Sequence, residues 1–86
     1  MPRSTESPDW VVTRRRAIGE QIRAAREYAN LTQEDIALAI PMDRSTYVRI
    51  ELGQSSPLLD TLIRIADAIG VPLAALVRGD PPRSST

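Results

Sequence analysis

Residues 31–53 decide the fold of this chain; they begin Leu31-Thr32-Gln33-Glu34-Asp35-Ile36-Ala37 and end Asp43-Arg44-Ser45-Thr46-Tyr47-Val48-Arg49-Ile50-Glu51-Leu52-Gly53. Thr32 and Asp35 have the spacing of a helix-capping pair, so a first helix is predicted to begin there. Pro41 ends that helix, because the residue before a proline is kept out of helical backbone. A second helix is predicted over 43–52, with Gly53 as its stop. The stretch therefore predicts two short helices joined by a tight turn.

The predicted second helix has two different sides. At about 100° per residue, Tyr47 and Ile50 point to one side, which suits a core. The other side carries Ser45, Val48, Arg49 and Leu52, with Arg44 in the first turn. Such a helix is typical of an ordinary solvated surface, and it is also the form of a helix that reads base edges in DNA. In the second case Arg44 and Arg49 are suited to guanine and Val48 to a thymine methyl group.

A longer helix is predicted before this stretch. Ser7-Pro8-Asp9 has the order of a helix start, with Ser7 as the capping residue and Pro8 as the first helical residue. Asn30 is predicted to end the helix, because asparagine tolerates left-handed backbone. The residues that recur at helical spacing along it are Val11, Ile18, Ile22, Ala25 and Ala29.

Two further helices are predicted after residue 53. Ser56-Pro57 repeats the order of cap and proline, so a fourth helix is predicted to begin there and to stop at Gly70. Pro72 opens a short fifth helix. The buried face of the fourth helix is predicted to consist of Leu59, Leu62, Ile65, Ala66 and Ile69.

These elements define one small domain. No stretch alternates in the manner of a strand, so the sequence predicts an all-α five-helix bundle over 10–78. We expect a mobile segment at 1–9 and a disordered tail at 79–86.

The composition excludes several classes of function. The 86 residues include no Cys and no His, which removes disulfides, thiolate metal sites and the commonest general base. We therefore expect no enzyme, no cofactor and no metal site. No apolar run approaches the ~20 residues of a membrane span, and no signal peptide is recognisable. The expected location is the cytoplasm, without membrane contact.

The net charge is zero, with 11 basic and 11 acidic residues. Modules that bind nucleic acid are usually basic, so this balance counts against DNA binding in its simplest form. All the basic residues are Arg, the better side chain for bidentate contact with guanine or phosphate. A GC-rich genome would also explain that preference for Arg.

Residues 18–76 resemble the Cro/repressor, or XRE, type of helix-turn-helix protein, over about sixty residues of this chain. The resemblance is carried by Ile18-Gly19-Glu20-Gln21-Ile22-Arg23, Arg26, Leu31-Thr32-Gln33-Glu34, Arg44-Ser45-Thr46, Arg49-Ile50-Glu51, Gly53, Pro57, Leu62, Ile65-Ala66, Ala68-Ile69-Gly70-Val71 and Leu76. Three residues depart from the family's pattern. Relatives commonly have glycine where this chain has Pro41, a polar or basic residue at Leu52, and a small polar cap at Leu58, whose role Ser56 would take.

The resemblance implies a role for each matching residue. The helix over 43–52 would be the recognition helix, with Arg44, Ser45 and Arg49 at base edges. Gln33, with Thr32 at the start of the preceding helix, would contact the phosphate backbone, as would Thr46. Arg26 and Glu51 match a structural salt bridge between the first and third helices of family members.

The run Arg14-Arg15-Arg16 lies outside the residues that carry this resemblance. A solvated charge run is the ordinary interpretation. The alternative is a clamp in which Arg14 and Arg15 hold phosphate beside the recognition helix.

One recognition helix reads only a few base pairs, so we expect a homodimer on palindromic double-stranded DNA. The first candidate interface is the fifth helix, with Leu73, Leu76 and Val77, and the second is Trp10. The sequence thus predicts a DNA-binding transcriptional regulator, in the first place a repressor. The alternative is a protein-interaction module, such as the antitoxin of a toxin–antitoxin pair.

Overall fold

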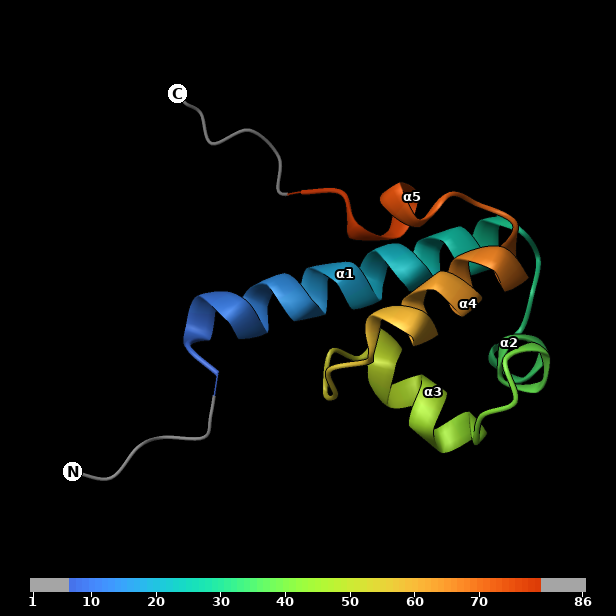
Figure 1. The fold of residues 1–86 in the computed structure, drawn as a ribbon, viewed down its shortest axis with the longest axis horizontal. Helices are drawn as coiled ribbons and strands as arrows, with labels where there is room; N and C mark the ends of the chain where they lie inside the picture. The colour runs from blue at the N-terminus through green and yellow to red at the C-terminus, as the bar shows by residue number, and fades with distance from the viewer. Residues whose placement is uncertain (1–6, 80–86) are drawn as a thin grey trace.

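The computed structural model describes residues 7–79, which form five helices and no strand (Figure 1). The helices are α1 Asp9–Tyr28, α2 Gln33–Ala39, α3 Arg44–Glu51, α4 Leu59–Ile69 and α5 Leu73–Val77. The predicted all-α, five-helix architecture is confirmed. The segments predicted to be mobile or disordered lie mostly outside the described residues.

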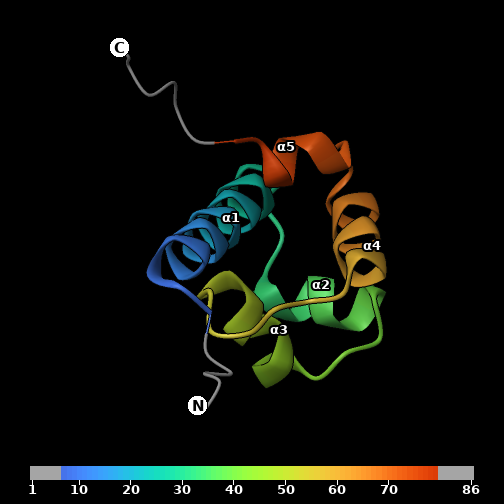
Figure 2. The same cartoon turned by 60° about the vertical axis from the view of Figure 1, so that its left-hand side comes forward.

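The five helices close around one core (Figure 2). The long helix α1 crosses the molecule and packs against both α3 and α5, while α2 packs against α3 and α4. The first turns of α1 extend beyond the other helices, at the left of Figure 1. The helices α2 and α3 therefore lie on the side of the bundle opposite α5.

Each helix contributes one almost completely buried side chain to the core. These are Ile22, Ile36, Tyr47, Ile65 and Leu76, in the order α1 to α5. Burying an aliphatic or aromatic side chain of this size contributes about 1.5–3 kcal/mol. No helix can therefore leave the bundle without exposing a large apolar group.

Most predicted helix ends are confirmed. Thr32 and Asp35 form a full capping box, with the Thr32 hydroxyl accepting from the Asp35 N–H at 3.0 Å. Asn30, Gly53 and Gly70 have positive φ angles of 60°, 72° and 91°. These residues provide the left-handed backbone that ends a helix.

Two predicted helix starts are wrong. Pro8 is the N-cap of α1, with an extended ψ of 157°, so the helix begins at Asp9 and Ser7 makes no cap. The fourth helix begins at Leu59 rather than at Ser56-Pro57. Pro57 instead lies in the loop, where it lines a hollow against α1. In both places an extended N-cap accepts the first backbone hydrogen bonds through its carbonyl, without a side-chain cap.

Two predictions about apolar residues are also corrected. Leu59 is 61% exposed, although it lies only about 20° around the helix from buried Ala66. Leu59 is the first residue of α4, about two turns before Ala66. Leu76 is fully buried inside the monomer, so it cannot form a dimer interface. Leu73 and Val77 are partly buried and pack against the same core.

Two glycines allow α1 and α3 to approach closely. A Cβ atom on Gly19 would lie 2.4 Å from the backbone oxygen of Glu51. A Cβ atom on Gly53 would lie 2.7 Å from the Cα of Arg16. Both distances are far below van der Waals contact, so the end of α3 can rest on α1 only where both glycines are present.

Candidate DNA-binding surface

The outward side of α3 is the most concentrated set of exposed polar side chains in the helix pair. Arg44, Ser45, Thr46 and Arg49 are exposed, and Val48 is half-buried. Tyr47 and Ile50 point into the core, as predicted. The four predicted base-reading residues therefore share one helix of eight residues, with their backbone fixed by the buried side.

A buried ion pair fixes α3 against α1. The Nε of Arg26 donates to Oε2 of Glu51 at 2.7 Å, and the second guanidinium nitrogen donates to Oε1 at 3.2 Å. The remaining nitrogen donates to the Leu31 carbonyl at 2.8 Å. The side chains of Arg26 and Glu51 are 9% and 2% exposed. The structural role of this pair, expected from the family resemblance, is thus consistent with its geometry.

Two further donors complete the environment of Glu51. The Tyr47 hydroxyl donates to Oε2, and Nε2 of Gln33 donates to Oε1 at 3.1 Å. Gln33 therefore braces α3 from the start of α2. Four hydrogen bonds on one carboxylate compensate for the removal of that charge from water.

These contacts shift the pKa values of the buried groups. Burial raises the pKa of the Glu51 carboxyl, but the hydrogen bonds from Arg26, Tyr47 and Gln33 outweigh it and hold that pKa below its usual value. Burial, with the bond to Glu51, raises the pKa of the Tyr47 hydroxyl. The network is therefore a charged carboxylate and a neutral phenol at neutral pH.

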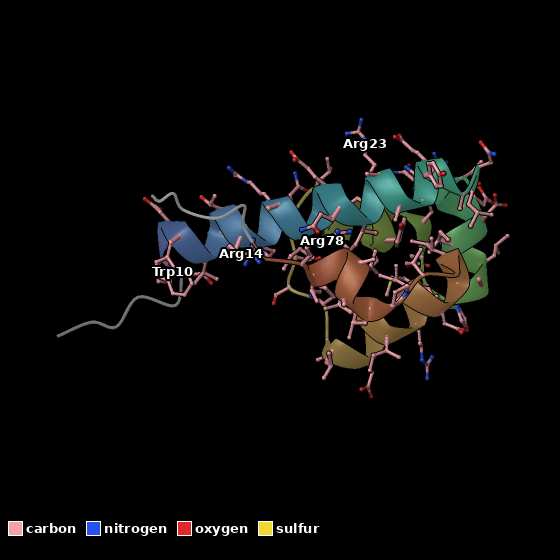
Figure 3. All side chains as sticks on the ribbon, turned by 90° about the horizontal axis from the view of Figure 1, so that it is seen from above. Trp10, Arg14, Arg23 and Arg78 are labelled. Atoms are coloured by element: carbon pink, nitrogen blue, oxygen red, sulfur yellow. The ribbon has the colours of Figure 1, made fainter. Side chains whose placement is uncertain are left out.

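Neighbouring arginines of the run on α1 have different surroundings. The Nε of Arg15 donates to the Gly53 carbonyl at 2.9 Å, so this side chain holds the end of α3. Arg14 lines the hollow between α1 and the start of α4. Arg14 lies on the side of α1 that faces α4 and α5, together with Trp10 (Figure 3). Contact of Arg14 or Arg15 with phosphate stays a prediction.

The start of α2 offers less to phosphate than the sequence suggested. The Thr32 backbone N–H donates to Oδ2 of Asp35 at 2.8 Å, and the Asp35 N–H is also used in the capping box. Hydrogen bonds from Thr32 lower the pKa of the Asp35 carboxyl. An exposed negative charge therefore stands beside Gln33.

Three contacts at this surface were not predicted from the sequence. They are the bond from the Tyr47 hydroxyl, the Arg15–Gly53 bond and the close approach of α1 to α3 at Gly19. Neither the Tyr47 hydroxyl nor the Arg15–Gly53 bond was foreseen, because both join residues whose spacing carries no signal by itself. Gly19 was a visible signal, since a glycine inside a helical pattern often marks a close approach of backbones. Leu52, which is 55% exposed at the end of α3, lies where the sequence placed it.

A sequence profile of the helix-turn-helix family matches residues 22–76, which include α2 and α3 and most of the core. The chain belongs to the helix-turn-helix family. Membership in the helix-turn-helix family agrees with the resemblance that the sequence showed over residues 18–76. Within residues 7–79, no helix is long and apolar enough to cross a membrane.

Two relatives of this chain are phage repressors by name. The chain is 40% identical over 57 residues to the cryptic phage CTXphi transcriptional repressor RstR of Vibrio cholerae. It is 35% identical over 60 residues to the immunity repressor protein of Bacillus phage phi105. The matches cover 66% and 70% of this chain but 51% and 42% of those proteins. The matched region thus spans about half the length of these relatives.

A solved helix-turn-helix structure has the same fold. The restriction-modification controller protein C.AhdI from Aeromonas hydrophila superposes with a TM-score of 0.68 and 28% identity. The superposition covers 71% of this chain and 92% of that protein. The five-helix arrangement is therefore one that a small regulatory protein of similar size also adopts.

Proposed function

We propose that this protein is a sequence-specific DNA-binding transcriptional regulator that acts as a repressor. The observation that carries the proposal is the exposed polar side of α3, held rigidly by the four hydrogen bonds on buried Glu51. A rigid helix with its polar side outward can enter the major groove without losing conformational freedom. The names of the two phage relatives and of C.AhdI support the same activity.

Base reading is assigned to the exposed arginines of α3. Arg44 lies in the first turn and Arg49 in the last turn, so they reach different base pairs. A bidentate contact of arginine with guanine contributes about 1–3 kcal/mol of discrimination. Ser45 and Val48 lie between them, as a donor or acceptor and as an apolar contact. The proposed activity is binding, without covalent chemistry.

Backbone contacts are assigned to the start of α2 and to Thr46. The Gln33 amide is already held by Glu51 through its nitrogen, so its orientation is fixed before DNA arrives. Thr32 and Thr46 are exposed and carry hydroxyl groups that suit phosphate oxygens. Because the net charge is zero, affinity must come from local arginines and from a second copy. We therefore propose a homodimer on a palindromic operator in the cytoplasm.

In-vitro selection of bound DNA, followed by gel shifts on the selected palindrome, tests the proposal. The Arg44→Ala/Arg49→Ala variant should lose sequence preference and bind at least ~10-fold more weakly. Arg23→Ala is the matched control, because Arg23 is exposed on α1 and points away from the side that carries α4 and α5 (Figure 3). Equal affinity and preference of the double variant and wild type would refute the assignment of α3.

A further inference from the structure

Three large apolar side chains are exposed together at the start of α4. Leu58, Leu59 and Ile63 are 74%, 61% and 48% exposed, and we call them the α4 patch. Leu59 and Ile63 are four residues apart on the helix, so they form one continuous stripe. A single exposed aliphatic group of this size is common, but three adjacent ones are typical of a surface that binds a partner.

An apolar hollow lies directly beside the α4 patch. It has a volume of about 240 Å³ and separates the first half of α1 from the start of α4. Its walls include Val11 and Ile18 from α1 and Pro57 and Leu62 from the start of α4. Leu62, which lines the hollow, is three residues from Leu59 and so lies about 60° around α4 from it. The hollow therefore borders the α4 patch.

Two unpaired charges border the α4 patch. Asp60 and Arg64 are exposed and lie four residues apart, yet within residues 7–79 neither forms an ion pair. On a helix they stand about 100° around from Leu59 and Ile63. The patch therefore has a charged margin on one flank and the apolar hollow on the other.

We propose that a second copy of this chain covers the α4 patch, with the two α4 helices antiparallel about a two-fold axis. This inference rests on the proposed function, which requires two recognition helices. In such a pair, Leu59 of one copy lies opposite Ile63 of its partner. The same axis places Asp60 of one copy opposite Arg64 of its partner, twice. Each copy also presents its Leu58 near the hollow of the other.

A second copy fits this face because the face is complementary to itself. A two-fold contact requires each feature and its complement on the same surface. The stripe of Leu59 and Ile63, the opposite charges of Asp60 and Arg64, and a hollow beside the projecting Leu58 meet that condition. The face is an apolar centre with a charged rim, which is the usual anatomy of a protein interface.

The test uses charge reversal in the full-length chain, measured by sedimentation velocity without DNA. Asp60→Arg and Arg64→Asp each create two like-charge pairs across the axis, so each should raise the dimer dissociation constant at least ~10-fold. Mixing the two variants restores both opposite-charge pairs and should give a heterodimer of near wild-type affinity. The variant with both changes should again form a homodimer. Recovery on mixing cannot arise from a folding defect.

Matched controls come from α1. Arg23 and Glu27 form an exposed pair at the same spacing, so Arg23→Asp and Glu27→Arg should leave the dimer unchanged within about twofold. A wild-type chain that stays monomeric at all concentrations overturns the proposal, as does a dimer indifferent to reversal at Asp60 and Arg64. In either case a different partner covers the patch.

The two proposals can fail separately. A monomer that still binds a selected half-site through Arg44 and Arg49 would overturn the α4 contact and leave the DNA-binding proposal standing. A dimer that follows the charge rules but selects no DNA sequence would support the contact and overturn the DNA-binding proposal.

Discussion

The Nε atom of Arg26 lies 2.7 Å from Oε2 of Glu51, and this pair joins the last turn of α1 to the last residue of α3. Its second hydrogen bond, at 3.2 Å, makes the contact bidentate. The Tyr47 hydroxyl donates to the same carboxylate, and α1 passes close to the Glu51 backbone at Gly19. The position of α3, the proposed recognition helix, thus depends on one buried carboxylate.

Removing one partner of this pair should be strongly destabilising. Arg26→Ala leaves the Glu51 charge buried with fewer donors, so the free energy of unfolding should fall by about 3–5 kcal/mol. Arg23→Ala is the control, since Arg23 pairs with Glu27 on the same helix at 60% and 55% exposure. That change should cost at most about 1 kcal/mol. Urea denaturation followed by circular dichroism measures both, and similar values for the two would contradict a special role for Glu51.

The same carboxylate predicts a dependence of stability on pH. The pKa of Glu51 is lower in the folded protein than in the unfolded chain, where it is about 4.3. The unfolded chain therefore takes up the proton first as the pH falls. The stabilisation is complete well above pH ~4.3 and is lost as the pH falls through the folded pKa.

Urea melts between about pH 7 and about pH 3 measure this loss. Glu51→Gln removes the titrating group, so its stability should change less steeply over the acid range than that of wild type. Asp35 also has a lowered pKa, so it too contributes to the loss of stability in acid. The variant Asp35→Asn measures that contribution of the capping box separately. An unchanged acid slope in Glu51→Gln would show that other carboxyls govern the acid transition.

Substitution of Gly19 should reverse the usual helix preference. In an exposed helix, alanine is better than glycine by about 1 kcal/mol. Here the new methyl group would meet the Glu51 carbonyl oxygen at 2.4 Å, so Gly19→Ala should destabilise by about 1–3 kcal/mol or more. Ala24→Gly, at an exposed position of α1, should lower the free energy of unfolding only by the difference in helix propensity, about 1 kcal/mol. Thermal melts compare the two, and a stabilised Gly19→Ala would mean that α1 and α3 are not in close contact.

Gln33 and Arg44 should affect DNA binding in different ways. Gln33→Ala removes a proposed phosphate contact and a brace on Glu51, so affinity should fall by a similar factor for every DNA sequence. Arg44→Ala should weaken binding to the preferred sequence most and relax preference at one base position. Binding to a panel of single-base operator variants distinguishes these outcomes. A change of preference in Gln33→Ala would move that residue to the base-reading group.

The sequence predicted local structure well where the signal lies in the chain itself. The Thr32–Asp35 capping box, the left-handed Asn30 and the stop at Gly70 follow from the conformational preferences of those residues alone. The serine–proline pairs at Ser7-Pro8 and Ser56-Pro57 predicted the wrong helix starts. At Pro8 and Pro57 a proline after serine fits both a first helical residue and the residues before a helix, and local rules do not separate these cases.

The burial of individual apolar residues was less predictable. Leu59 and Leu76 have the same side chain in neighbouring helices, yet one is 61% exposed and the other fully buried. The exposure of each depends on which other helix crosses at that point. Spacing along one helix indicates a stripe, but the width of that stripe is set by its neighbours.

The sequence by itself determined five helices, their stops and the polar outer side of α3, because backbone preference and helical periodicity act within a few residues. The tertiary structure alone decided that Tyr47, Gln33 and Arg26 meet on Glu51, that Arg15 holds Gly53, and that Leu58, Leu59 and Ile63 stay exposed. These contacts join residues from different helices, and their distances follow from how the helices cross. These contacts therefore depend on packing, which acts over short distances in space between residues far apart in the chain.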